Sequence, residues 1–296
     1  MDKALKIRRA SHAGSWYEAN KENLNLTLEN FLSVPMKINN ESNKILKAII
    51  GPHAGLEYSG PTAGFAYTNI NPKNYSRVFL LGPSHHMYTT SICLPYGEIY
   101  ETPLGDIEVD KEIISKLKKE KYFDTLKKNQ EEKEHSLELH LPFIKKVFGE
   151  NPFKLIPLMI GHINSNQQDY YGKILSDYLK DEKNLFIISS DFCHWGSNFD
   201  YQPTEGPIKN TSQFIEKLDK LGIDLITSHN EKGFSEYLDE TNNTICGCYP
   251  ILVYLYALKY AGLGNANTEL LKYSQSGKIS TVNDMSVSYA SIVTYV

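Results

Sequence analysis

Short apolar runs alternate along the chain with longer segments whose apolar residues recur at helical spacing. The runs have the length of buried β-strands and cover residues 46–51, 78–82, 155–161, 185–190, 270–273 and 287–296. Predicted helices lie between several of them, at residues 60–68, 110–119, 135–148, 167–179, 214–221 and 249–261. This alternation indicates an α/β fold with a central, largely parallel or mixed sheet flanked by helices.

No Pro- or Ser-rich linker and no internal repeat interrupts the pattern, so we expect residues 1–296 to form a single domain. A hydrophobic fraction of 41% is enough for a sizeable core. Two segments fall outside this description. Residues 39–43 are a polar low-complexity run, and residues 1–8 are charged and expected to be disordered.

The overall composition of the chain argues against several classes of protein. A net charge of −4 argues against a general nucleic-acid binder. No apolar stretch reaches 18 residues, so we expect no membrane span. The N-terminus lacks the apolar core of a signal peptide, and the four cysteines are therefore expected to be thiols. We expect a cytoplasmic protein, with the nucleus as a second compartment.

A histidine follows an apolar run within a few residues at three places, His53, His85 and His194. If the runs are parallel strands of one sheet, these imidazoles reach the same edge, where α/β proteins bind ligands. Each histidine alone is more typical of a structural role, but the repeated position favours a shared site. Asp191 adds a carboxylate there, although it could equally cap a helix or form a turn. The pattern predicts a metal or acid/base site.

Two further histidines, His135 and His140, follow the predicted strands less directly. They lie five residues apart, not four, so they diverge around a helix and do not form a zinc-protease motif. His135 could still point into the site from the start of a helix, whereas His140 is expected to point elsewhere.

Cys246 and Cys248 form a Cys-x-Cys pair at a predicted helix entrance. Without a second pair this is weak support for structural zinc. A thiol at a helix N-terminus has a depressed pKa, which favours metal ligation. The alternative is a buried, inert thiol in front of an apolar helix.

Seven motifs, in order along the chain, closely resemble the Memo family (mediator of ErbB2-driven cell motility). They are Ser11-His12-Ala13-Gly14-Ser15-Trp16-Tyr17, Pro52-His53-Ala54-Gly55, Leu81-Gly82-Pro83-Ser84-His85-His86, Glu134-His135-Ser136-Leu137-Glu138, Ser189-Ser190-Asp191-Phe192-Cys193-His194-Trp195-Gly196, Asn243-Thr244-Ile245-Cys246-Gly247 and Ser286-Val287-Ser288-Tyr289-Ala290. The resemblance implies a fold similar to class III extradiol dioxygenases, which hold non-haem Fe(II) with two histidines and a glutamate.

The resemblance also implies roles for individual residues. The implied metal ligands are His53, His85 and Cys246. Asp191 and His194 are the implied catalytic candidates beside them. Three further histidines are expected to surround the ligands: His135, His86 and His12. Iron or copper is the implied ion, and the softer thiolate ligand also admits zinc.

Cys246 stands where the dioxygenases have a carboxylate, which argues against ring-cleaving oxygenation. The first functional hypothesis is therefore a metal-binding protein in signalling, cell motility and redox or iron homeostasis. The second is an active metal-dependent oxidase or dioxygenase. The third is an adaptor with a vestigial metal site that binds a phosphotyrosine peptide or signalling protein, although the chain has no Arg cluster of the kind that binds phosphate.

Overall fold

The structure is a computed structural model that describes residues 4–34 and 44–296. The polar run at residues 39–43 and the first three residues of the predicted disordered segment lie outside the described residues. Ile7 and Arg8, for which disorder was also expected, instead form strand β1 (Ile7–Arg8), which pairs with β5 (Ile99–Tyr100). A further strand, β6 (Ile107–Glu108), completes this small sheet.

The main sheet contains nine strands within the described ranges and is mixed, as the alternating pattern predicts. Four central strands run parallel in the order β2 (Leu46–Gly51), β9 (Asn184–Ser189), β3 (Arg77–Pro83) and β8 (Lys154–Ile160). On one side follow β4 (Ile92–Leu94) and β7 (Phe123–Thr125). On the other side, β12 (Ser286–Tyr295) runs antiparallel to β2 and pairs with β11 (Asn267–Gln275) and β10 (His194–Trp195).

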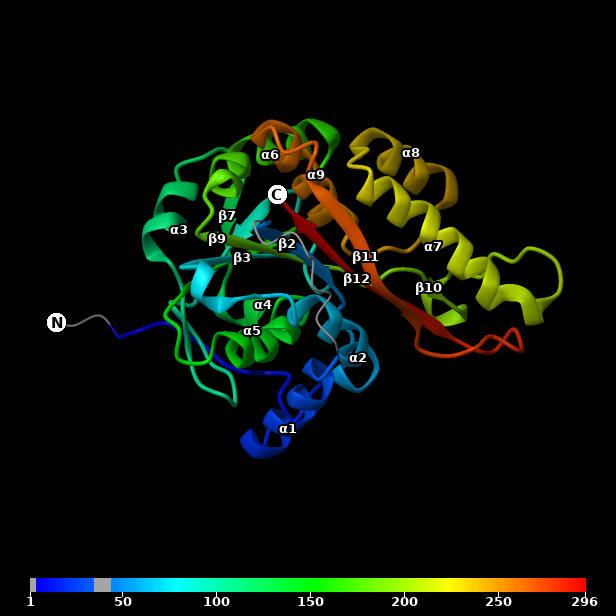
Figure 1. Cartoon of the computed structure of the whole chain (residues 1–296), viewed down its shortest axis with the longest axis horizontal. Coiled ribbons are helices and arrows are strands. Elements are labelled where there is room, and N and C mark those ends of the chain that lie inside the picture. Colours follow the sequence, from blue (N-terminus) through cyan, green and yellow to red (C-terminus); the bar gives the residue numbers. More distant parts are fainter. Residues whose placement is uncertain (1–3, 35–43) are drawn as a thin grey trace.

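Helices cover both faces of this sheet (Figure 1). One face carries α3 (Lys111–Leu117), α6 (Ser165–Lys180), α7 (Thr211–Thr227), α8 (Glu231–Thr241) and α9 (Cys248–Ala261). The other carries α1 (Lys21–Leu32), α2 (Leu56–Tyr67) and α5 (Leu141–Phe148). The short α4 (Lys128–Lys133) lies near β1.

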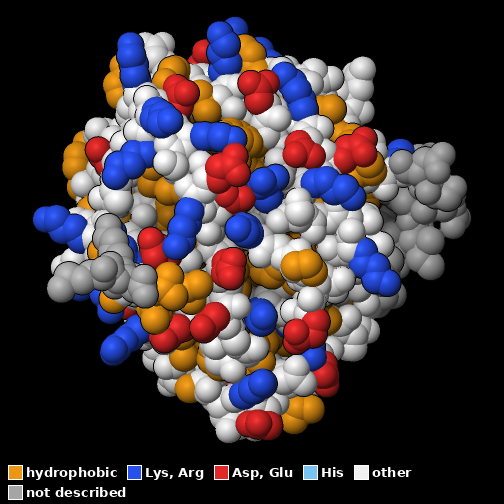
Figure 2. Space-filling model, turned by 90° about the vertical axis from the view of Figure 1, so that its left-hand side faces the viewer, with side chains coloured by type: hydrophobic (Ala, Val, Ile, Leu, Met, Phe, Trp, Pro, Cys, Tyr) orange, Lys and Arg blue, Asp and Glu red, His pale blue; other side chains and the backbone are white. Residues whose placement is uncertain are grey.

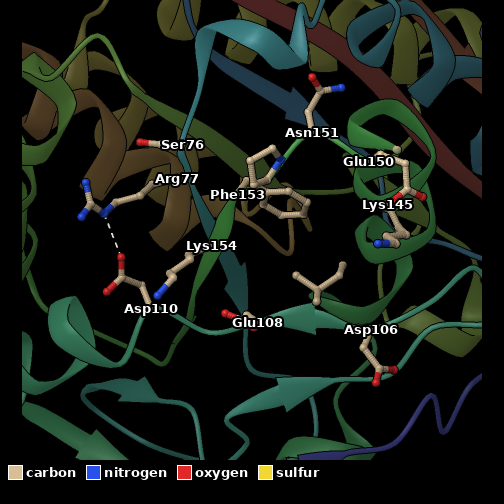
Figure 3. A pocket seen from close by; sticks show the side chains of 13 residues that line it. Ser76, Arg77, Asp106, Glu108, Asp110, Lys145, Glu150, Asn151, Phe153 and Lys154 are labelled. Atoms are coloured by element: carbon tan, nitrogen blue, oxygen red, sulfur yellow. Dashed lines mark hydrogen bonds and ion pairs between the residues drawn. The ribbon is translucent and has the colours of Figure 1, made fainter.

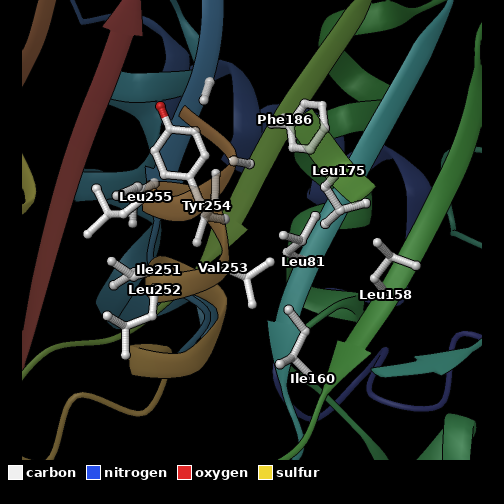
Figure 4. Close-up of a cluster of buried hydrophobic side chains, with 14 of the residues drawn as sticks. Leu81, Leu158, Ile160, Leu175, Phe186, Ile251, Leu252, Val253, Tyr254 and Leu255 are labelled. Atoms are coloured by element: carbon white, nitrogen blue, oxygen red, sulfur yellow. The ribbon is translucent and has the colours of Figure 1, made fainter. Parts of the chain in front are cut away.

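Alternation along each central strand divides the core into two layers. In β2, Ile50 belongs to the cluster under α6 and α9, whereas its neighbour Ile49 belongs to the cluster under α1, α2 and α5. Successive side chains of a strand point to opposite faces, so a strand buried on both sides is apolar throughout. Figure 4 shows the first layer, where α9 side chains such as Val253 lie close to Leu81 of β3.

The predicted central strands agree with the structure to within a residue or two at each end. The predicted helix 214–221 is too short, because α7 covers Thr211–Thr227. The predicted helix 135–148 starts too early, because α5 begins only at Leu141. Pro142 lacks a backbone N–H and occupies the first turn of α5, where that donor is not needed. His135 therefore lies in the connection after α4. Helices α1, α4 and α8 were not predicted.

The contact between α6 and α9 depends on Gly172. A Cβ atom there would lie 2.3 Å from Cβ of Tyr256, so the two helices would have to separate. Gly172→Ala is expected to lower the free energy of unfolding by about 1–3 kcal/mol, despite alanine's higher helix propensity. Urea unfolding measures the change. Gly264→Ala is the control, because no atom lies within 4 Å of its Cβ position; equal effects of the two variants would contradict the packing argument.

Within the described chain, none of the helices is long and apolar enough to cross a membrane. Figure 2 shows Lys and Arg side chains interspersed with Asp and Glu side chains over one face of the molecule. The described part of that face therefore presents a surface of mixed charge rather than an extended basic patch.

Candidate metal centre

Three neighbouring strands bring the predicted residues to one edge of the sheet. His53 follows β2, Asp191 follows β9 and His85 follows β3, and these strands lie side by side and parallel. Among the described residues, two groups of ligand atoms result, each with its atoms within 4.8 Å of one another. The groups are His53 with His85 and His135, and His53 with Asp191 and Cys246. His53 is common to both.

The hydrogen bonds of His53 define which ring nitrogen is available. Its Nδ1 lies 2.6 Å from the Ser189 hydroxyl, which itself donates to the carbonyl of Ser136 at 2.7 Å. Because the hydroxyl hydrogen is used there, Nδ1 must carry the hydrogen of the imidazole, and Nε2 keeps its lone pair. Burial, followed by the neighbouring histidines, lowers the pKa of His53 well below its usual range. The His53 ring is therefore neutral and held in one orientation, with the lone pair of Nε2 available to bind a metal ion.

His85 is oriented in the same way by a carboxylate. Glu134 accepts from the His85 backbone N–H at 2.6 Å and from Nδ1 at 2.9 Å, which leaves Nε2 of His85 available. Burial alone would raise the pKa of Glu134, but the hydrogen bonds that it accepts from the side chain and the backbone of His85 help to lower it to about 2. Such carboxylate–histidine pairs fix the orientation of metal-binding imidazoles. This role of Glu134 was not predicted from the sequence, although Glu134 adjoins His135 in one of the seven motifs.

Asp191 and Cys246 face His53 from the other side. Asp191 Oδ1 accepts from the backbone N–H of His53 at 2.9 Å, and Oδ2 lies 3.9 Å from Nε2 of His53. Cys246 Sγ lies 3.2 Å from the same Nε2 and accepts from the Asp191 backbone N–H at 3.3 Å. Imidazole, thiol and carboxylate thus meet within one small volume.

The predicted depression of the Cys246 pKa is wrong. Helix α9 begins at Cys248, with Gly247 as its cap, so Cys246 precedes the helix. Burial, together with the carboxylate of Asp191, raises the pKa of the Cys246 thiol well above its usual range. An ion at this position would have to displace the thiol proton.

His194 lies outside both ligand groups, at the start of β10. Its backbone N–H donates to the Thr244 hydroxyl at 2.7 Å, and its Nδ1 contacts the Thr244 carbonyl at 3.1 Å. A carbonyl only accepts, so Nδ1 carries the hydrogen and Nε2 has a lone pair. His140 is buried, and its Nδ1 lies 2.7 Å from the Tyr67 hydroxyl.

The three histidines expected around the ligands occupy different places. The His135 ring stacks on His85 at 4.5 Å and on Trp16 at 4.3 Å, between ring centroids. Within residues 4–34 and 44–296, the buried Nδ1 of His135 has no hydrogen-bond partner, and burial lowers the pKa of His135 to about 3. His86 meets the His135 ring edge-on at 5.7 Å. His12 lies farther out, with Nδ1 at 2.7 Å from Glu138. His135 is therefore nearer to a ligand position than the sequence reasoning expected.

A separate hollow of about 530 Å³ lies at the opposite edge of the sheet, where β3 and β8 begin (Figure 3). Arg77 and Lys154, the first residues of these strands, line it, and Arg77 forms an ion pair with Asp110 at 2.8 Å. Its lining contains neither histidine nor cysteine. The groups suited to a transition metal are therefore gathered at the other edge.

Whether a metal ion fits this site depends on the chemistry of the side chains that could bind it. His53 presents its Nε2 lone pair beside the Cys246 thiol and the Asp191 carboxylate, and His85 presents its own beside His53 and His135. Neutral imidazoles with a thiolate suit copper, zinc or iron, and a carboxylate adds a ligand that iron accepts. The residues present fit a transition-metal ion.

The chain is similar to known proteins over nearly its whole length. The family described as "Memo-like protein" matches residues 8–293, nearly the whole chain. This chain belongs to the Memo family. The family resemblance predicted from the seven motifs is thus confirmed.

Curated members of the Memo family are similar along the whole chain. "Protein MEMO1" of Danio rerio is 41% identical, and that of Homo sapiens 39%, each covering 98% of this chain and 98% of the relative. The Caenorhabditis elegans "Protein memo-1 homolog" is 40% identical over 98% of this chain and 83% of its own.

Among solved structures, the chain is similar to an uncharacterized protein, JW3007, from Escherichia coli K12. The TM-score is 0.55 at 13% identity, covering 84% of this chain and 99% of the other. At this identity the similarity shows the fold alone. It agrees with the predicted single-domain α/β architecture, with a mixed sheet flanked by helices.

Proposed function

We propose that this Memo-family protein binds one iron or copper ion through His53, His85 and Cys246. The observation that supports this most directly is the protonation pattern of the two histidines. Ser189 and Glu134 occupy the Nδ1 atoms, so both Nε2 lone pairs can bind an ion, that of His53 once the ion displaces the proton of the neighbouring Cys246 thiol. Cys246 Sγ, only 3.2 Å from Nε2 of His53, is the third donor. Zinc is a further candidate ion, because it accepts the same donors.

A bound iron or copper ion supplies one-electron redox chemistry. The protein contributes a buried, oriented donor set and two groups that can handle protons. Asp191 is buried, and burial is the main cause that raises the pKa of its carboxyl group. This carboxyl group therefore holds a proton more readily than an exposed aspartate does. The Nε2 lone pair of His194 can accept a proton. Both fit the catalytic assignment made from the sequence.

The cellular role belongs to the same proposal. The family resemblance supports a part in signalling, cell motility and redox or iron homeostasis. A phosphotyrosine peptide or another signalling protein is the partner that this resemblance suggests.

A metal-dependent oxidase or dioxygenase is the second candidate, and Asp191 is the observation that favours it. With its Oδ2 3.9 Å from Nε2 of His53, it could supply the carboxylate that Cys246 replaces in the dioxygenase pattern. Oxygen uptake by the iron- or copper-loaded protein, with a panel of catechols, tests this activity. Uptake no faster than that of the free ion would remove it.

The ligand set is tested by anaerobic titration of the metal-free protein with Fe(II), Cu(I) and Zn(II) in turn. We expect one ion per chain. Cys246→Ser should weaken Cu(I) binding by on the order of tenfold or more, and Fe(II) binding less, because Fe(II) accepts the Asp191 carboxylate in place of sulfur. Competition with a coloured chelator gives the affinities.

Cys248→Ser is the matched control, because this thiol lies two residues away and belongs to neither ligand group. It should bind all three ions as the wild type does. Absence of any ion at one per chain would overturn the proposal. Equal Cu(I) affinity in Cys246→Ser and wild type would overturn the ligand set.

A further inference from the structure

The segment 134–138, which joins α4 to the helical turn Glu138–His140, contacts both proposed histidine ligands. Its first residue, Glu134, accepts two hydrogen bonds from His85. The carbonyl of Ser136 accepts from the Ser189 hydroxyl, which in turn accepts from Nδ1 of His53. One short segment therefore defines the protonated nitrogen of both rings.

The same segment packs tightly on the end of β3, which leads to His85. The Ser136 hydroxyl donates to the carbonyl of Pro83 at 2.7 Å. A Cβ atom at Gly82 would lie 2.8 Å from the Leu137 side chain, so the segment rests directly on the strand backbone. A shift of the segment would therefore move the partners of both histidines together.

Arg8 fixes this segment from the N-terminal strand β1. Its guanidinium is 1% exposed and forms an ion pair with Glu138 at 2.7 Å. The same nitrogen, Nη2, also donates to the carbonyls of Glu134 at 3.0 Å and Glu131 at 3.3 Å. Arg8 thus contacts both ends of the segment, more than 120 residues away in the chain.

We infer that segment 134–138 is a single positioning element for His53 and His85, and that Arg8 is the positioning residue that anchors it. The guanidinium holds the segment through Nη2 while its Nη1 donates to the carbonyl of Arg9 at 2.9 Å, and the single nitrogen of a lysine cannot reproduce this planar, two-nitrogen geometry. Arg8 touches neither ring. It acts through Glu134 on His85 and through Ser136 and Ser189 on His53.

The test uses full-length, metal-free protein labelled with ¹⁵N-histidine, in which two-bond ¹H–¹⁵N spectra report the protonated ring nitrogen. Wild type should show His53 and His85 protonated at Nδ1. Arg8→Lys keeps a positive charge near Glu138 and should convert both rings to mixtures of the two neutral forms. Ser189→Ala should affect His53 alone, and Glu134→Gln should affect His85 alone.

The second measurement is the metal affinity of the same variant, and this part of the test rests on the proposed function. Arg8→Lys should weaken Zn(II) binding by about tenfold. This is the lower end of the loss in affinity that follows substitution of residues that support metal ligands without binding the metal. Arg77→Lys is the matched control, because it alters a partly buried Arg–Asp pair at the opposite edge of the sheet. It should leave the spectra and the affinity unchanged.

The outcomes separate the two proposals. Wild-type spectra in a folded Arg8→Lys protein would overturn the role of Arg8. If Arg8→Lys does not fold, retention of Nδ1 protonation in both Ser189→Ala and Glu134→Gln would overturn the positioning element. If wild type binds no ion while the spectra change as expected, the positioning holds and the proposed metal binding fails.

Discussion

His53→Ala is expected to weaken metal binding at least about 100-fold, more than any other single ligand substitution. Its Nε2 belongs to both groups of ligand atoms, so its removal breaks each of them. Loss of His85 leaves His53 with Asp191 and Cys246, and loss of Cys246 leaves the histidine group. Substitution of a residue that only hydrogen-bonds to a metal ligand typically lowers metal affinity by about 10–100-fold. Loss of a ligand that both groups share should lower the affinity at least as much.

Equilibrium competition with a chelator, using Zn(II) and Fe(II) separately, measures the effect of His53→Ala. Circular dichroism checks the fold, because His53 is buried and its removal leaves a cavity. His162→Ala is the control: its ring is exposed and stacks on Tyr88 outside the ligand groups. A folded His53→Ala protein that binds within about threefold of wild type would contradict the shared-ligand position.

The convergence of His53, Asp191 and His85 could be predicted because strand ends are encoded locally. An apolar run marks a strand buried on both faces, and parallel strands end at the same edge. The residue that follows each run therefore has a predictable place. The start of α5 could not be read from apolar spacing alone, and this moved His135 from a predicted helix into the segment that borders the site.

The partners of the histidines were not predictable by the same reasoning. Ser189 ends a buried strand and reads as part of an apolar run, whereas Arg8 lies in a segment expected to be disordered. Their roles depend on contacts between segments more than 120 residues apart. The pKa of Cys246 is a similar case, because burial beside Asp191 outweighs the proximity of a helix start. Tertiary contacts, not local sequence, decide such properties.

Glu138→Gln is expected to lower the free energy of unfolding by about 3–5 kcal/mol. This is the typical cost of removing one partner of a buried ion pair and leaving the other charge unpaired. The carboxylate is fully buried and accepts only from donors: the Arg8 guanidinium, the Tyr17 hydroxyl, and the backbone N–H and Nδ1 of His12. A glutamine would turn an NH₂ group toward some of these donors and leave Arg8 without its anionic partner.

The effect should also depend on pH in a defined direction. Burial alone would raise the pKa of Glu138, but the hydrogen bond from His12 and the charge of Arg8 hold it below its ordinary value. A carboxyl with a lower pKa in the folded than in the unfolded chain stabilises the fold above the unfolded value of about 4.3. That stabilisation is lost as the pH falls through the folded value. The difference between wild type and Glu138→Gln should therefore be full at pH 7 and shrink below about pH 4.

Urea unfolding at pH 7, 5 and 3.5, followed by far-ultraviolet circular dichroism, measures both the size and the pH dependence of the Glu138→Gln effect. Glu112→Gln is the control, because this exposed carboxylate pairs with Lys116 one turn along α3. Such exposed pairs contribute little to stability, because water and salt screen them. If Glu138→Gln cost no more than this control, Arg8 would not depend on Glu138 for its buried position. The N-terminal strand would then be held mainly by its hydrogen bonds to the carbonyls of Glu131 and Glu134.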